Sequence, residues 1–196
     1  MLFLIRHGQT EFNLQGRLQG RMDSPLTPLG QEQAKRMALC LKPFVEAPEH
    51  WEVIASPLGR TQRTAEIVCE TLGLGGGISL DHRLAEVDVG DWEGLSREDI
   101  EAIAPGVIGT PGWLLRTPGG ETYEAVAERL GSWLAGIDEN DGRKRLVVSH
   151  GIAGRVLRNL YAGGGQDPGA PAPQTPQDAV FRLYGGVAGR IDDHGD

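Results

Sequence analysis

The chain begins with five apolar residues, 1–5, that end abruptly in Arg6-His7-Gly8. A short apolar run closed by a glycine is typical of a buried β-strand that stops where its polar residues begin. In open α/β sheets, ligands bind just beyond the carboxyl ends of the strands. We therefore expect Arg6 and His7 to lie where a ligand would bind, although any strand can end in this pair without a function.

Strand-like and helix-like segments alternate along the rest of the chain. Besides the run at 1–5, short strands are predicted at 51–55, 78–80 and 145–149, with a closing hairpin at 179–191. Apolar residues at helical spacing predict helices at 28–45, 58–72, 96–104, 119–137 and 152–160. This alternation predicts an α/β fold, a three-layer α/β/α sandwich with a mostly parallel central sheet.

The chain shows no internal repeat and no linker that would divide it, so we expect a single domain over 1–196. Within it, residues 87–118 are less regular and are predicted to form a short lid-like segment. Residues 163–176 are rich in glycine and proline and are predicted to form a surface loop.

The charge and the composition exclude several classes of partner. A formal net charge of −8 argues against nucleic acid and anionic membranes, since both need a basic face, but a locally positive pocket can still take a small anionic substrate. The apolar run at 1–5 is too short for a signal-peptide core or a membrane span, so we expect a cytoplasmic location. Cys40 and Cys69 are expected to be reduced core residues, and no cluster of ligand-type side chains points to a metal site.

Three predicted strands end in polar residues of a related kind. The first ends in Arg6 and His7, the second leads through Ser56 to Arg60 in the next helix, and the strand at 145–149 ends in His150. If these strands are parallel neighbours, two histidines and two arginines converge at one edge of the sheet, beside helix N-termini. Several fixed cations and an in-line nucleophile are what phosphoryl transfer requires.

A neutral imidazole can be that nucleophile and form a covalent phosphoenzyme. We assign the nucleophile to His7, which follows an arginine and precedes a glycine, and the stabilisation of developing charge to His150. The reaction also needs a proton donor for the leaving group and a base for water. Glu86 is the preferred carboxylate, because a neighbouring phosphate dianion favours its protonated form, but spacing alone does not select it over Asp88 or Glu93.

These residues belong to a longer ordered set of motifs. The set resembles the signatures of the histidine phosphatase superfamily, the phosphoglycerate mutase-like proteins, and runs from residue 2 to about 160. Its members are Leu4-Ile5-Arg6-His7-Gly8-Gln9-Thr10 with Asn13, Gly16-Arg17-Leu18-Gln19-Gly20, Pro25-Leu26-Thr27, Ser56-Pro57-Leu58-Gly59-Arg60, Leu84-Ala85-Glu86, Trp92-Glu93-Gly94, Gly119-Gly120-Glu121 and Val147-Val148-Ser149-His150-Gly151.

The resemblance implies a phosphoglycerate mutase-like fold and a role for each matching position. His7 is the phosphorylated nucleophile and Glu86 the acid and base, while the phosphate pocket is formed by Arg6, Arg60 and His150. The resemblance also implies that the reaction needs neither a metal ion nor a cofactor. Three further positions match residues near the transferred phosphate, although they could instead only order a turn: Asn13, Gln19 and Gly20.

Some charged residues near these motifs have two interpretations. Arg63 departs from the family pattern and either adds charge near the pocket or forms an ion pair. Arg21 is expected to be solvated or to order a turn, and Glu93 to order a loop. Glu121 either reaches the pocket or favours the N-terminus of its helix, and we favour the second role.

The resemblance leaves two enzymatic readings. A phosphoglycerate mutase must hold a second anionic group and protect the phosphoenzyme from water, yet residues 87–118 contain only two cations, Arg97 and Arg116. A short and mostly acidic or apolar segment predicts a more open pocket in which water attacks the phosphohistidine. We therefore expect a metal-independent phosphatase of the histidine acid type that hydrolyses a small phosphorylated metabolite.

Two alternatives to this hydrolase stay open. One is phosphoryl transfer of the phosphoglycerate mutase type, and the other is a non-catalytic phosphate-binding regulator, which is disfavoured because all five chemical positions are filled. Either a monomer or a homodimer is compatible with the sequence.

Overall fold

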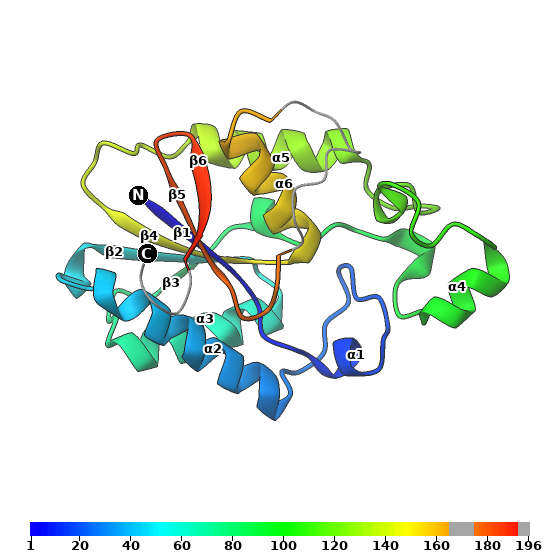
Figure 1. The fold of residues 1–196 in the computed structure, drawn as a ribbon, viewed down its shortest axis with the longest axis horizontal. Coiled ribbons are helices and arrows are strands. Elements are labelled where there is room, and N and C mark those ends of the chain that lie inside the picture. Colours follow the sequence, from blue (N-terminus) through cyan, green and yellow to red (C-terminus); the bar gives the residue numbers. More distant parts are fainter. Residues whose placement is uncertain (165–174, 192–196) are drawn as a thin grey trace.

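A six-stranded sheet forms the middle layer of the protein (Figure 1). The computed structural model describes residues 1–164 and 175–191, so most of the loop predicted at 163–176 lies outside the described residues. The strand order is β3-β2-β4-β1-β5-β6, and the first four of these strands are parallel. The strands are β1 (Leu2–Arg6), β2 (Trp51–Ala55), β3 (Ile78–Leu80), β4 (Lys144–Ser149), β5 (Val180–Tyr184) and β6 (Val187–Ile191).

Helices cover both faces of this sheet. The pair α2 and α3 lies on one face and the pair α5 and α6 on the other, whereas α1 and α4 lie beyond the ends of the strands (Figure 1). This arrangement confirms the three-layer α/β/α sandwich with a mostly parallel sheet. The α-helices are α1 (Glu11–Leu14), α2 (Pro28–Leu41), α3 (Gly59–Leu72), α4 (Arg97–Ile103), α5 (Tyr123–Ala135) and α6 (Gly151–Tyr161).

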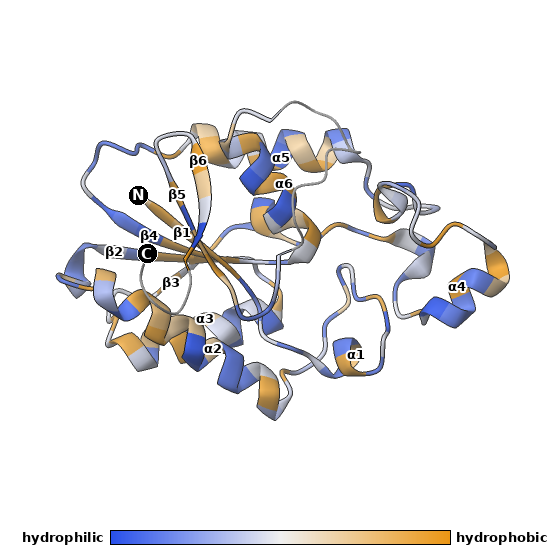
Figure 2. Cartoon of the chain, in the orientation of Figure 1, coloured by the Kyte–Doolittle hydropathy of each residue, from blue (hydrophilic) through white to orange (hydrophobic). Residues whose placement is uncertain are grey.

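Strand β1 is buried on both faces, and its side chains alternate between two cores. Phe3 and Ile5 pack into the core under α2 and α3, whereas Leu2 and Leu4 pack into the core under α5 and α6. This alternation is the two-residue period of a strand, and burial on both faces explains its unbroken apolar sequence. Figure 2 shows β1 in the colour of hydrophobic residues, between helices that carry both hydrophobic and hydrophilic residues.

Two predicted helices differ from those observed. Helix α2 ends at Leu41 and passes into a 3₁₀ turn, Lys42–Phe44, instead of continuing to residue 45. Pro43 explains this end, because proline has no N–H for the next helical hydrogen bond. Helix α5 spans Tyr123–Ala135 rather than 119–137, since the Thr122 side chain caps its first turn and Gly119 has a left-handed φ of 68°.

The segment 87–118 contains little regular structure. It holds the 3₁₀ turns Gly90–Trp92 and Trp113–Leu115 and the short helix α4, which begins with a capping box between Ser96 and Asp99. The 3₁₀ turns elsewhere are Pro48–His50 and His82–Leu84. No helix within the described ranges is long and apolar enough to cross a membrane.

The stability of this core depends on the central strand β4. Leu146 is fully buried there, so Leu146→Ala should lower the free energy of unfolding by about 2–5 kcal/mol through lost burial and a residual cavity. Urea denaturation measures this loss. Leu39→Ala is the matched control, because Leu39 on α2 is 56% exposed and its replacement should change stability by no more than about 0.5 kcal/mol. Equal losses in the two variants would contradict the assignment of the core.

Candidate active site

Backbone pairing between β1 and β4 brings the two predicted histidines together. Arg6 is paired with Ser149, and the next amide, that of His7, donates to the Ser149 carbonyl at 3.1 Å. The rings of His7 and His150 consequently meet edge to face, with their centroids 5.2 Å apart. Both side chains are buried, so the sheet register alone places the two imidazoles side by side at the carboxyl ends of the strands.

The hydrogen bonds of His7 determine its tautomer. Its Nδ1 lies 2.8 Å from the Gly8 carbonyl oxygen, which only accepts, so Nδ1 carries the hydrogen. The lone pair is then on Nε2, which accepts a hydrogen bond from Nε of Arg60 at 3.3 Å. Gly8 must be a glycine for packing as well, since a Cβ there would collide with the backbone of Gly30 in α2. The ring is thus held with its unprotonated nitrogen toward Arg60.

Burial and positive neighbours keep both imidazoles neutral. Burial lowers the pKa of His7 well below 6.5, and the charges of Arg6 and Arg60 lower it further. Burial likewise lowers the pKa of His150 well below 6.5, with contributions from Arg60, His7 and Arg6. A neutral ring with an unprotonated nitrogen is the form that a nucleophile or a hydrogen-bond acceptor requires.

Arg60 lies in the first turn of α3, and the loop that precedes α2 fixes its guanidinium. Its Nη2 donates to the Gly20 carbonyl at 2.8 Å and its Nη1 to the Met22 carbonyl at 2.8 Å. Asp23 pairs with Nη1 at 3.0 Å and also accepts from the Arg60 amide. Sequence reasoning did not assign Asp23 to the site, although it lies between two of the matched motifs, Gly16-Arg17-Leu18-Gln19-Gly20 and Pro25-Leu26-Thr27. Gly20 contributes its carbonyl to this arginine.

Arg6 and His150 each have a side-chain nitrogen that no residue in the described ranges contacts through a hydrogen bond. Arg6 donates from Nη1 to the Thr175 carbonyl at 3.1 Å, and His150 uses Nε2 in a 2.7 Å hydrogen bond with Ser56. Nε of Arg6 and Nδ1 of His150 are buried without a hydrogen-bond partner among the described residues. Buried polar groups in native proteins are usually satisfied, and a group bound in the cavity that Arg6 lines could supply the missing partner.

Glu86 caps the N-terminus of α6. Its Oε2 accepts from the amides of Gly151 at 3.0 Å and Ile152 at 3.2 Å, and its Oε1 accepts from Ala153 at 2.9 Å and Val87 at 3.0 Å. A carboxylate at this position is stabilised by the exposed N–H groups and by the helix dipole. The carboxyl group is therefore held directly beside Gly151, the residue that follows His150.

The sequence did not decide which of three carboxylates is the acid and base, and these three have different surroundings. Glu86 lines the cavity at the strand ends. Asp88 accepts from the Gly90 amide within a tight turn, and Glu93 accepts from the amides of Arg21 and Met22. Neither of these two lines the cavity, so the geometry distinguishes Glu86 from both. The loop-ordering role predicted for Glu93 agrees with its contacts.

Asn13 and Gln19 line the cavity and also order the first loop. Asn13 forms a capping box with Thr10, and its Oδ1 accepts from Gln177 at 2.6 Å. Gln19 donates to Thr10 at 2.7 Å and accepts from Ser24 at 3.2 Å. Both side chains are therefore within reach of a bound group while their present partners belong to the loop.

The structure shows the contacts of Arg63 and Glu121, for each of which the sequence allowed two roles. Arg63 pairs with Glu66 at 2.8 Å and does not line the cavity, which supports the ion-pair interpretation. The N-terminal role predicted for Glu121 is wrong, because Thr122 caps α5 while the Glu121 carboxylate pairs with Arg129 at 2.7 Å. Sequence periodicity did not reveal this pair, since its members are eight residues apart and only one of them is in a helix.

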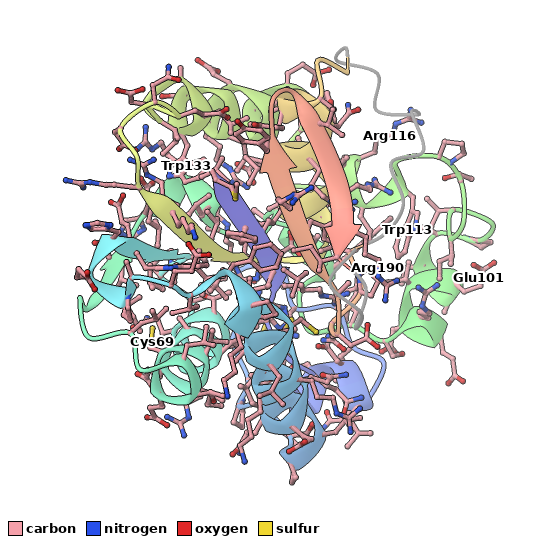
Figure 3. All side chains as sticks on the ribbon, turned by 60° about the vertical axis from the view of Figure 1, so that its left-hand side comes forward. Cys69, Glu101, Trp113, Arg116, Trp133 and Arg190 are labelled. Carbon is pink, nitrogen blue, oxygen red and sulfur yellow. The ribbon has the colours of Figure 1, made fainter. Side chains whose placement is uncertain are left out.

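The cavity encloses about 490 Å³ and extends well beyond the histidine pair. Its far wall is residues 109–115, including Trp113, which Figure 3 shows on the segment beside α4. Arg97 lines it, but Arg116 does not. Sequence reasoning missed Arg155, which lies on α6 one helical turn after Gly151 and so on the same face. Within the ranges described, no group of three or more His, Cys, Asp or Glu side chains is placed to hold a metal ion.

The lowered pKa values of His7 and His150 predict a pH dependence of stability. Each ring binds a proton more readily in the unfolded chain, so the unfolded state gains protons first as the pH falls below about 6.5. Below this pH, the free energy of unfolding should fall by up to about 1.4 kcal/mol per pH unit for each ring. Above it, the free energy of unfolding should keep its full value. Urea denaturation at pH 7.5, 6.5 and 5.5 measures this slope.

His150→Gln should roughly halve the slope between pH 6.5 and 5.5, because one of the two rings is removed. The carboxylates titrate mainly below this window and so contribute little to it. An unfolding free energy that does not change from pH 7.5 to 5.5 would contradict the burial of both neutral rings.

Proteins of known structure share this fold over nearly the whole chain. The α-ribazole phosphatase from Shigella flexneri has a TM-score of 0.77 and 26% identity, with 96% of this chain and 93% of that chain covered. A mycobacterial glucosyl-3-phosphoglycerate phosphatase has a TM-score of 0.75 and 28% identity, with 96% and 94% covered. Both of these similar proteins are phosphatases by name.

Sequence comparison adds a relative with a different name. "Probable phosphoglycerate mutase GpmB" from Cronobacter sakazakii is 40% identical over 158 residues, which are 78% of this chain and 70% of that protein. The sequence model of the histidine phosphatase superfamily (branch 1) matches residues 2–177. Together with the shared fold, this match shows that the chain belongs to the histidine phosphatase superfamily.

Proposed function

We propose that this protein hydrolyses a small phosphorylated metabolite through a phosphohistidine on His7. The observation that carries the proposal is the state of that ring, which is buried and neutral and has its lone pair on Nε2 at the wall of the cavity. Arg6 and Arg60 flank it and supply positive charge for the phosphoryl oxygens. His150, with its unpartnered Nδ1, adds a polar group beside the same ring.

In the first proposed step, the Nε2 lone pair of His7 attacks the phosphorus of the monoester. The N–P bond forms as the P–O bond to the organic group breaks, and Glu86 in its acid form gives a proton to the leaving oxygen. The products of this step are the free alcohol, phosphohistidine and the Glu86 carboxylate.

In the second proposed step, water replaces the alcohol. The Glu86 carboxylate takes a proton from the water as its oxygen attacks phosphorus, and the P–N bond breaks. Inorganic phosphate leaves, His7 regains its lone pair and Glu86 regains its proton. The arginines keep the same positive charge beside the phosphoryl group throughout, so the balance of atoms and charges is complete with monoester and water alone.

Phosphoryl transfer of the phosphoglycerate mutase type is the second candidate. The name of the GpmB relative favours it, and so does the presence of Arg17, Arg97 and Arg155 in the cavity, where they could hold a second anionic group. Hydrolysis is favoured by the names of the two similar structures and by a cavity roomy enough to admit water beside a phosphohistidine. The two reactions share the first step and differ in what accepts the phosphoryl group.

The two candidates are separated by a panel of phosphomonoesters, assayed with and without a chelator and with added 2,3-bisphosphoglycerate. Release of inorganic phosphate that the chelator leaves unchanged is the expected result. Isomerisation of 3-phosphoglycerate faster than phosphate release would instead establish the mutase reaction. A loss of turnover on chelation would overturn the metal-independent route.

His7→Ala should abolish hydrolysis, with turnover reduced by at least about 10³-fold, because the covalent intermediate cannot form. Inorganic phosphate should still bind, since Arg6 and Arg60 remain, and isothermal titration measures that binding. The control is His50→Ala, which removes an exposed histidine outside the cavity and should leave turnover unchanged. A wild-type protein that binds phosphate yet hydrolyses no member of the panel would support the non-catalytic regulator.

A further inference from the structure

The backbone around Glu86 is held by side chains rather than by a neighbouring strand. Nη1 of Arg129 donates to the carbonyls of Arg83 at 2.6 Å and Ala85 at 2.9 Å, and Nη2 reaches the Glu86 carbonyl at 3.4 Å. Arg21 donates from Nε to the same Glu86 carbonyl at 2.7 Å. Two arginines, one from α5 and one from the first loop, thus fix the main chain that carries this carboxyl group.

Glu121 links the two arginines. Its carboxylate accepts from Nε of Arg129 at 2.7 Å and from Nη2 at 3.0 Å. This bidentate ion pair fixes the relative orientation of the two side chains as well as pairing their charges. Its Oε2 also lies 3.4 Å from Nη2 of Arg21 and accepts from the Asp88 amide at 3.2 Å. In return, the Glu121 amide donates to the Asp88 carbonyl at 2.8 Å. Glu121 therefore holds both arginines and the chain just after Glu86.

The environment of Glu121 is that of a fixed, ionised group. Its side chain and that of Arg129 are each only 15% exposed. Burial raises the pKa of Glu121, but hydrogen bonding and charge from Arg129, with smaller contributions from the Asp88 amide and Arg21, lower it overall. A pair held this closely restricts the motion of the segment that it binds.

None of these three residues lines the cavity, although Glu86 does. Their hydrogen bonds connect them to the cavity through the main chain of Glu86, and the charge of Arg129 also lowers the pKa of His150. A general acid must lie within about 2.6–3.2 Å of the atom that it protonates. A displacement of about 1 Å can cost about 10²-fold in rate.

We propose that Glu121 and Arg129 are positioning residues that hold Glu86 for proton transfer to the leaving group. The inference rests on the proposed hydrolase function. It assigns a purpose to the Gly119-Gly120-Glu121 motif: the close approach of Gly120 to the Asp88 carbonyl leaves no room for a Cβ and lets the Glu121 amide and carboxylate meet Asp88.

The test compares two monoesters that differ in their need for a proton. An alkyl phosphate leaves as a strongly basic alkoxide and depends on Glu86, whereas p-nitrophenyl phosphate leaves as a stabilised phenolate and does not. Arg129→Met and Glu121→Gln should each lower kcat/KM by about 10²-fold for the alkyl ester and by less than about tenfold for the aryl ester. Arg129→Lys should retain more activity on the alkyl ester than Arg129→Met. Lysine keeps a charged donor but lacks the planar guanidinium that forms two parallel hydrogen bonds.

Combination with Glu86→Gln gives a second readout. Glu86→Gln removes the proton donor, so adding Glu121→Gln to it should cause no further loss with the alkyl ester. Arg145→Met is the matched control, because Arg145 is also a buried arginine in an ion pair, with Glu52 at 2.9 Å, but lies outside the cavity. It should lower stability in urea denaturation and leave the ratio of the two activities unchanged.

Each outcome is decisive. Equal losses for the two esters, or additive losses in the double variant, would show a general structural role and overturn the positioning inference alone. No loss in either single variant would do the same. No turnover of either ester by the wild-type protein would overturn the proposed hydrolase function, and this inference with it.

Discussion

The hydrogen bond from Nδ1 of His7 to the Gly8 carbonyl is the contact on which the rest of the site depends. It holds the ring in one tautomer and leaves Nε2 as the acceptor that Arg60 meets. The contact exists because β1 ends at Arg6 and the chain passes close to the first turn of α2, where only a glycine fits. Strand β1, helix α2 and the chemistry of the imidazole are therefore parts of one packing arrangement.

Arg60 and Glu86 illustrate two ways in which the fold places charge in that arrangement. Arg60 is buried but bound by two carbonyls and Asp23, so its positive charge is compensated from the loop side while Nε faces His7. Glu86 is bound by amides at the N-terminus of α6. Burying either charge without hydrogen-bond partners would cost free energy of folding. The fixed partners of Arg60 and Glu86 offset that cost.

The convergence of Arg6, His7 and His150 could be predicted from the sequence, because parallel strands bring their carboxyl ends to one edge of the sheet. The pairing of Glu121 with Arg129 could not, since it depends on how the loop before α5 folds back onto that helix. The same limit applies to the start of α5, where helical periodicity did not show that Gly119 takes a left-handed φ. Local patterns predict elements, whereas contacts between loop and helix depend on tertiary packing.

The capping of α6 by Glu86 has a consequence for how this protein can change during evolution. Functional groups are often held at a cost in stability, so that replacing them makes a protein more robust. Here the same carboxyl group satisfies three amides that would otherwise be left open at a helix end. Loss of the acid would leave that helix end unsatisfied, so a lineage could not gain robustness by abandoning it. Selection on folding alone would thus favour an acceptor side chain at position 86, even in a descendant that no longer turned over a substrate.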